Sequence, residues 1–200
     1  MTLATRFALA TALLALAIGG CTSGDPETTE RKTISGSYVG MVAGSDAYVA
    51  IVIGPDGDAL AHVTDGAYSV DWVAGVVTGR TASLSNEGGA TLEAQLSRRA
   101  VTGSFTRPQS PTLTFSAAPA KAPAGLYRAV EDFADGRYVG GWVVLPDGTE
   151  RGTVRRYETP LTPGEVDATT FQPGDATFPV PGGVLRPELV RPSSKLSLPN

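Results

Sequence analysis

Residues 90–96 read ATLEAQL, and this segment decides the fold class. Apolar and polar side chains alternate strictly along it, which is the pattern of a β-strand with one buried and one solvated face. Short runs of β-branched, aromatic and alternating residues continue from residue 35 to about residue 156, separated by turn signals. No stretch after residue 21 has a convincing amphipathic helical stripe. The sequence therefore predicts an all-β domain.

The expected architecture is an antiparallel meander of about ten strands over residues 35–156. Residues 48–53 form a nearly continuous apolar strand that ends in PDGD, a sequence typical of a bulged hairpin turn. A closed barrel and a two-layer β-sandwich both fit this pattern. Glycines at 103, 140 and 141, inside expected strands, favour a curved sheet. We expect a small barrel and keep the β-sandwich as the alternative.

A weak internal repeat relates the two ends of this domain. GSY at 36–38, an apolar run and PDG at 55–57 recur as GLY at 125–127, an apolar run and PDG at 146–148. If the meander closes, its first and last strands pair, and these two hairpins lie side by side. The alternative is two ordinary hairpins with common turn chemistry.

The C-terminal segment, residues 157–200, carries eight prolines in 44 residues. Proline removes a backbone donor and fixes φ, so this density disfavours regular strand ladders. We expect an extended, partly polyproline II tail that wraps the barrel or is disordered.

Residues 1–20 have the organisation of an export signal, with Arg6 followed by an uncharged apolar stretch at 8–18. Residues 18–21, IGGC, resemble the lipobox of bacterial lipoproteins. That resemblance implies that Cys21 becomes the lipidated N-terminus and holds the mature chain on the outer face of the cell membrane through a diacylglyceryl group and further acyl chains, such as palmitate. Residues 21–34 then form a flexible tether. The alternative is an ordinary signal peptide followed by a buried cysteine.

Composition excludes some classes of protein. Charged residues make up 18% of the chain and the net charge is −4, whereas nucleic-acid binding by phosphate neutralisation needs a concentrated cationic face. The single cysteine excludes an intrachain disulfide. We expect no nucleic-acid partner.

Candidates for catalysis or metal binding are few, and we expect neither a catalytic site nor a cofactor. His62 is the only histidine, and we interpret it as a barrel-wall residue on the face of Leu60. Residues 56–58, DGD, lack the further ligands of a calcium loop and predict a turn. Glu131, Asp132 and Asp135 could supply paired carboxylates or, as solvated turn charges, could pair with nearby arginines.

Two further groups are candidates for contact with a partner. The arginines at 151, 155 and 156 suit a protected sheet edge or contact with anionic lipid or wall polymer. Six aromatic residues are expected in the core and would line a ligand cavity if the barrel were hollow. They are Tyr38, Tyr48, Trp72, Tyr127, Tyr138 and Trp142.

Residues 125–129 (GLYRA), 141–148 (GWVVLPDG) and 46–50 (DAYVA) are similar to segments of uncharacterised secreted proteins and lipoproteins of actinobacteria. That resemblance implies no activity and no catalytic residue. The leading hypothesis is a non-catalytic module that binds a small apolar or wall-derived ligand or a partner protein. The alternatives are a structural or protease-inhibitor-like barrel and an unrecognised hydrolase.

Overall fold

Every regular element in the described part of the chain is a β-strand. The computed structural model describes residues 34–67, 70–158, 162–168 and 177–199. The prediction of an all-β fold is confirmed. The expected export signal, Cys21 and almost all of the tether lie outside the described residues.

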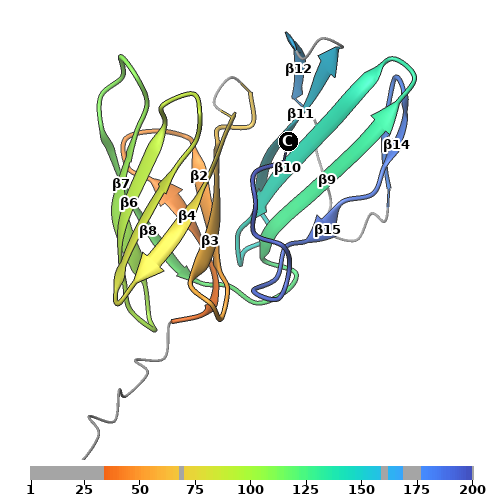
Figure 1. Cartoon of the computed structure of the whole chain (residues 1–200). Coiled ribbons are helices and arrows are strands. Elements are labelled where there is room, and N and C mark those ends of the chain that lie inside the picture. Colours follow the sequence, from red (N-terminus) through yellow and green to blue (C-terminus); the bar gives the residue numbers. More distant parts are fainter. Residues whose placement is uncertain (1–33, 68–69, 159–161, 169–176, 200) are drawn as a thin grey trace, which may run out of the picture. The chain divides into compact units, whose positions relative to one another are not determined.

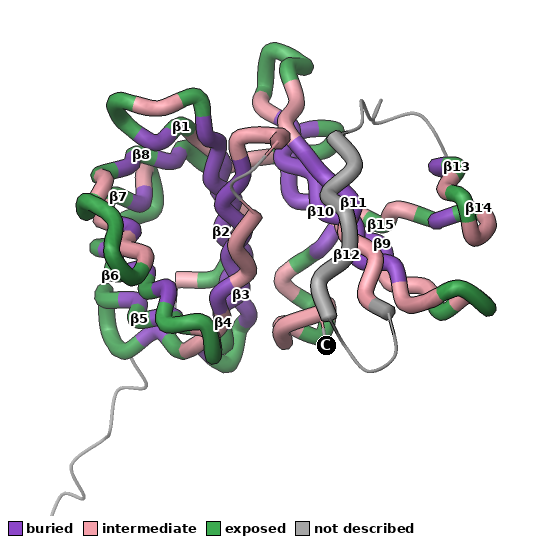
Figure 2. Tube along the Cα trace, turned by 90° about the horizontal axis from the view of Figure 1, so that it is seen from above, coloured by how far each residue is buried: buried purple, intermediate pink, exposed green. Residues whose placement is uncertain are grey.

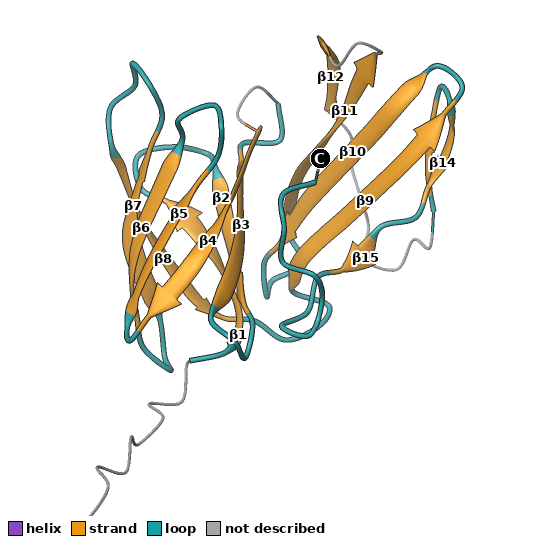
Figure 3. Ribbon diagram, in the orientation of Figure 1, coloured by secondary structure: helices purple, strands orange, loops and turns teal. Residues whose placement is uncertain are grey.

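The first eight strands form a closed antiparallel barrel in meander order, in which β1 pairs with both β2 and β8 (Figures 1 and 3). The barrel, preferred over the sandwich on the basis of sequence, is therefore the observed architecture. Its strands are β1 (Gly36–Val42), β2 (Tyr48–Ile53), β3 (Asp58–Thr64), β4 (Val70–Thr78), β5 (Thr81–Ser85), β6 (Thr91–Leu96), β7 (Val101–Thr106) and β8 (Leu113–Pro119).

Alternation along the strands fills the barrel interior. In β6, Leu92, Ala94 and Leu96 are buried and belong to one hydrophobic cluster to which all eight strands contribute. The intervening residues of β6 are exposed, as the alternation predicts. Gly103 in β7 lies so close to β6 that a Cβ there would come 2.0 Å from the Glu93 carbonyl oxygen, which explains why a strand interior holds a glycine.

The barrel closes at Pro119, before the expected boundary at residue 156. Because β8 occupies the open edge of β1, the second copy of the hairpin repeat has no barrel edge to pair with and instead starts a separate sheet. The order of this sheet is β12-β11-β10-β9-β15. Its strands are β9 (Gly125–Phe133), β10 (Gly136–Val144), β11 (Glu150–Glu158), β12 (Thr162–Ala168) and β15 (Glu188–Leu189).

The described part of the C-terminal segment contains more regular structure than its proline content predicts. Strand β12 pairs with β11, and β15 pairs with β9. Two short strands, β13 (Phe178–Val180) and β14 (Gly183–Leu185), form a hairpin. Each tail strand other than β12 is only two or three residues long, so the pairings fit between or beside prolines at sheet edges.

The two copies of the repeat meet face to face through side chains rather than edge to edge through hydrogen bonds. On the outer wall of the barrel, Val39, Ala50 and Leu60 pack in one cluster with Leu126 and Val143 of the second sheet. All six residues of β2 are consequently buried, whereas the outward residues of β5 and β6 are exposed (Figure 2).

Candidate ligand-binding site

A pocket of about 400 Å³ lies at the end of the barrel where the β1–β2, β3–β4 and β7–β8 connections meet. These connections come from three separate parts of the chain. The residues that line the pocket are Ser45, Asp46, Ala47, Val63, Asp65, Ala67, Phe105, Arg107, Ser110, Pro111 and Leu113.

The floor of the pocket is apolar. Ala47, Val63 and Phe105 are at most 5% exposed and belong to the interior cluster, against which Leu113 also packs. They are the last inward-facing side chains at this end, so the pocket rests on a packed core. These packed side chains keep the pocket lining in a fixed position. An apolar part of a ligand could pack on them.

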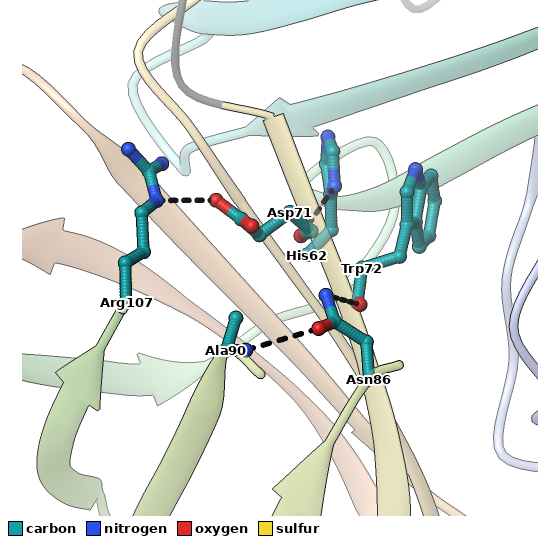
Figure 4. A network of polar contacts seen from close by, with 6 residues as sticks. All are labelled: His62, Asp71, Trp72, Asn86, Ala90 and Arg107. Atoms are coloured by element: carbon teal, nitrogen blue, oxygen red, sulfur yellow. Dashed lines mark hydrogen bonds and ion pairs between the residues drawn. The ribbon is translucent and has the colours of Figure 1, made fainter. Parts of the chain in front are cut away.

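The rim carries charge of both signs. Arg107 Nε donates a 2.6 Å hydrogen bond to Asp71 Oδ2, and this ion pair ties the end of β7 to the start of β4 (Figure 4). Asp65 Oδ1 accepts a 2.9 Å hydrogen bond from the Ala67 amide, which shapes the start of the β3–β4 connection. Asp46 is exposed at the tip of the β1–β2 turn.

His62 lies outside this pocket, in a separate buried polar site. It is fully buried on the outer barrel wall, beside Leu60 as expected, with its ring stacked on Trp72 at a centroid distance of 4.1 Å (Figure 4). Its Nδ1 lies 3.1 Å from the Asp71 carbonyl oxygen. Since a carbonyl can only accept, the neutral ring carries its proton on Nδ1.

The second sheet covers the other side of this imidazole. A Cβ on Gly141 of β10 would lie 2.4 Å from the Trp72 ring and 2.7 Å from His62 Nε2, so only glycine lets the strand approach this closely. Nε2 faces the Gly141 backbone without a well-formed hydrogen bond to any described residue. Burial lowers the pKa of His62 to about 4, the two backbone contacts oppose that shift, and the charge of Arg155 adds to it.

Asp71 connects the two sites. Its carboxylate holds Arg107 at the pocket, while its carbonyl oxygen accepts a hydrogen bond from His62 Nδ1 on the outer wall. Beside it, Asn86 donates to the Trp72 carbonyl oxygen at 2.9 Å and accepts from the Ala90 amide at 3.0 Å, which fixes the β5–β6 turn against β4 (Figure 4).

The six aromatic residues proposed as a cavity lining lie in three different places. Tyr38 faces the barrel interior and lines a separate pocket of about 400 Å³ at the opposite end of the barrel. Tyr48 and Trp72 pack on the outer wall in contact with the second sheet. The remaining three belong to a cluster on the other face of that sheet, and none of the six lines the barrel-end pocket. They are Tyr127, Tyr138 and Trp142.

The acidic residues near 131 each face a different arginine. Asp132 lies 3.8 Å from Arg137, in agreement with the expectation that these carboxylates could pair with nearby arginines. Glu131 lies 4.0 Å from Arg186, and Asp135 lies 3.6 Å from Arg156. Asp135 also accepts a 2.7 Å hydrogen bond from the Tyr138 hydroxyl, which lowers the pKa of Asp135.

The DGD segment forms the expected turn, since Gly57 has φ 91° and the Gly54 amide donates to the Asp58 carbonyl oxygen at 2.8 Å. Within the described ranges, no group of three or more histidine, cysteine, aspartate or glutamate residues is placed to hold a metal ion. The same part of the chain contains no helix long and apolar enough to cross a membrane.

Sequence reasoning missed the residues of the barrel-end pocket. The only local signal was a polar loop following a strand at each of three places, and polar loops occur throughout the chain. Comparison with protein families, curated proteins and solved structures found no match to this chain.

Proposed function

We propose that this protein is an extracytoplasmic lipoprotein whose barrel binds a small ligand without transforming it. The IGGC motif at 18–21 supports anchoring at the cell membrane through a diacylglyceryl group on Cys21. The barrel-end pocket supports ligand binding and is the observation on which the proposal depends.

The pocket has the properties expected of a small-molecule site. Its volume of about 400 Å³ falls within the range of ligand pockets. An apolar floor beneath a few polar groups supplies both affinity and orientation. The packed barrel beneath it keeps the site preformed, which limits the entropy lost on binding.

Two observations favour binding over hydrolysis. The only histidine of the chain is buried on the outer wall of the barrel and is not part of the pocket lining. The carboxylates near residue 131 each face a separate arginine, so they do not form the facing carboxylate pair that glycoside hydrolysis uses.

A nuclear magnetic resonance titration tests the proposal. The mature domain, labelled with nitrogen-15, is titrated with 4-phenylbutanol, a neutral probe whose aromatic ring can cover the floor at Phe105. We expect chemical-shift changes centred on the lining residues. Leu113→Trp, which fills the pocket, should abolish them, whereas Val76→Trp should not, because Val76 is 56% exposed on the outer wall.

Two results would contradict the proposal. The first is saturation with the probe without any shift in the pocket. The second is a response centred on another surface, such as the groove between β9 and the C-terminal segment around Arg128 and Lys195. Dispersed spectra of both variants serve as the control for folding.

A further inference from the structure

We infer that the end of the barrel opposite the barrel-end pocket (the entry end) docks on a membrane surface that contains anionic phospholipids. This inference rests on the proposed function, because it gives an orientation to a protein anchored through Cys21. It depends on where the chain enters the barrel and on which charged residues surround that point.

The chain enters the barrel at the end where β1 begins and where β2, β4, β6 and β8 finish (Figure 1). The Ala120 amide, just after β8, donates to the Ser37 carbonyl oxygen at 2.8 Å and closes the barrel there. Cys21 precedes Ile34 by 13 residues, which span at most about 45 Å. A lipid on Cys21 therefore reaches the entry end by the shortest path along the chain.

Four exposed cations surround the point of entry. Arg80 lies in the β4–β5 turn, Arg98 and Arg99 lie at the tip of the β6–β7 turn, and Lys121 follows β8. Their side chains make no ion pair with any described residue. Their charge is therefore free to act on a partner.

Local hydrogen bonds hold two of these turns together. The Ser97 hydroxyl accepts from the Ala100 amide at 2.9 Å and closes the turn that carries the two neighbouring arginines. The Leu96 amide donates to the Arg80 carbonyl oxygen at 2.8 Å, which places the β4–β5 turn beside it. A charged surface that is already formed loses little conformational entropy when it binds.

Carboxylates are fewer at the entry end. Among the described barrel connections there, negative charge comes from Asp56 and Asp58, in and next to the β2–β3 turn. Lys195 of the C-terminal segment lines a groove with them. The connections therefore carry four positive charges against two negative ones, with a further cation beside the carboxylates.

The second pocket of about 400 Å³, at the entry end, suits a phospholipid headgroup. Its lining joins Arg98 to the apolar or aromatic side chains of Ile34, Tyr38, Pro119 and Ala120. A guanidinium binds phosphate oxygens through charge-assisted hydrogen bonds, and the neighbouring apolar side chains give the glycerol backbone a surface to contact. This combination favours a lipid surface over a soluble polyanion.

Docking at the entry end leaves the barrel-end pocket facing away from the membrane. Each exposed lysine or arginine near an anionic surface strengthens binding about fivefold, equivalent to roughly 1 kcal/mol. With two net positive charges on these connections, we expect about a 25-fold preference for anionic over neutral vesicles. The preference should shrink at 0.5 M sodium chloride because salt screens exposed charges.

Vesicle sedimentation measures this preference. The mature chain, residues 21–200, is made with Cys21→Ser so that it carries no acyl group, and is mixed with vesicles of phosphatidylcholine alone or with an equal part of phosphatidylglycerol. Arg98→Gln should lower the preference about fivefold, and the triple change Arg80→Gln, Arg98→Gln and Arg99→Gln should bring it close to one. Arg186→Gln is the matched control, since this side chain is 68% exposed beside Glu131 of the second sheet, and it should leave the preference unchanged.

A second measurement reads the orientation on the membrane. Cys21, the only cysteine of the chain, is coupled chemically to a maleimide lipid in the same vesicles, and hydrogen–deuterium exchange is followed along the chain. We expect slower exchange at residues 97–100 and 119–124 on anionic vesicles than on neutral ones. Residues 43–47 and 107–112, at the opposite end, should exchange at the same rate on both.

The outcomes separate this inference from the proposed anchor, which detergent partitioning of the lipidated protein tests on its own. If the chain shows no preference for anionic vesicles, if the triple variant keeps the preference, or if the protection falls on the opposite end, the inference is wrong and the anchor stands. If partitioning finds no lipid on Cys21 but the preference follows the three arginines, the anchor fails and the inference stands. Tighter binding to soluble polyphosphate than to phosphatidylglycerol vesicles, at equal phosphate concentration, would identify a polyanion as the partner and overturn the inference.

Discussion

The stability of this protein should fall as the pH drops from 7 to 4, because His62 cannot take up a proton inside the fold. Burial lowers its pKa in the folded state from 6.5 to about 4. In the unfolded chain the imidazole becomes protonated near pH 6.5. The unfolded state therefore binds more protons throughout this interval, and acid favours unfolding.

The size of the effect follows from the pKa difference. One pKa unit corresponds to 1.36 kcal/mol, so the loss of unfolding free energy is on the order of 3 kcal/mol once the pH is below about 4. The contribution is fully present above pH 6.5 and is lost progressively below it. For a domain of this size, the melting temperature should fall by roughly 6–12 °C. Asp135 and Asp147, whose pKa values are lowered by hydrogen bonds, contribute in the same direction only at lower pH.

Urea denaturation at half-unit steps from pH 7.5 to 4.5 measures this slope. Because the chain has one histidine, a substitution removes the only side chain whose ordinary pKa lies in the interval. His62→Gln keeps a donor for the Asp71 carbonyl oxygen, and His62→Phe keeps the aromatic stack on Trp72. Both variants should be less stable at pH 7.5, but their stability should vary little between pH 7 and pH 5.5.

The wild-type protein gives an independent reading if either variant fails to fold. Its single imidazole produces one carbon-13-labelled Cε1 resonance, which should remain in the neutral form down to about pH 5. A midpoint between pH 6 and 7, or a wild-type slope that persists in a folded variant, would refute the description of His62 as sealed between the barrel and β10.

Three further predictions concern the anchor, the contact between barrel and sheet, and the C-terminal segment. Cys21→Ser should abolish lipidation and move the protein from the detergent phase to the aqueous phase in a partition assay; membrane retention after a high-salt wash would contradict the lipobox interpretation. Gly141→Ala should cost about 1–3 kcal/mol in urea denaturation because a Cβ has no room there, whereas Gly36→Ala, with no atom closer than 3.4 Å, should cost less. Leu185→Ala should cost about 2–4 kcal/mol because this side chain is fully buried, while Val184→Ala, 40% exposed, should be nearly neutral; equal costs would show that β14 does not pack as described.

The barrel strands could be predicted because the alternation of apolar and polar residues that defines each strand lies within a few consecutive residues. Each strand from β5 to β8 has one face in the core and one in solvent, and a period of two in residues 91–96 is enough to show which side chains point inward. Glycine 103 indicated curvature for the same reason, since only the approach of a neighbouring strand requires its missing side chain.

The second sheet could not be predicted in the same way. The alternation within a strand shows which side chains are buried, but it does not show which other strand it pairs with. The hairpin at 125–148 and the strand at 113–119 both suit the open edge of β1, and the nearer one takes it. One signal did indicate a second layer. Residues 48–53 are apolar at every position, which means burial on both faces, whereas a barrel surrounded by solvent needs only one.

The C-terminal segment shows where a compositional rule stops applying. Proline density argues against long ladders, yet a pairing of two or three residues at an edge needs few amide donors. Phe178 and Leu185 then bury Trp142 and its neighbours on the face of the sheet that the barrel does not cover. The apolar residues between the prolines indicated that this segment packs against the sheet. The prediction of an extended tail relied on the number of prolines instead.

The pocket was beyond sequence reasoning because its lining comes from connections about 20 and 60 residues apart, and nothing local distinguishes Asp46, Asp65 or Arg107 from other charged loop residues. Closure of the barrel is what brings them together, because every second connection of a meander falls at the same end. Occupancy of one end by the β1–β2, β3–β4 and β7–β8 connections follows from strand order alone. Which of those loops leaves space above the core depends on the inward side chain that ends each strand. Here the buried side chains of Val63 and Phe105 form the floor of the pocket, and the charged residues of the loops form its rim. A search for sites in other closed meanders should therefore start from strand order, take the loops at one end together, and ask where the last inward residues leave room for a ligand.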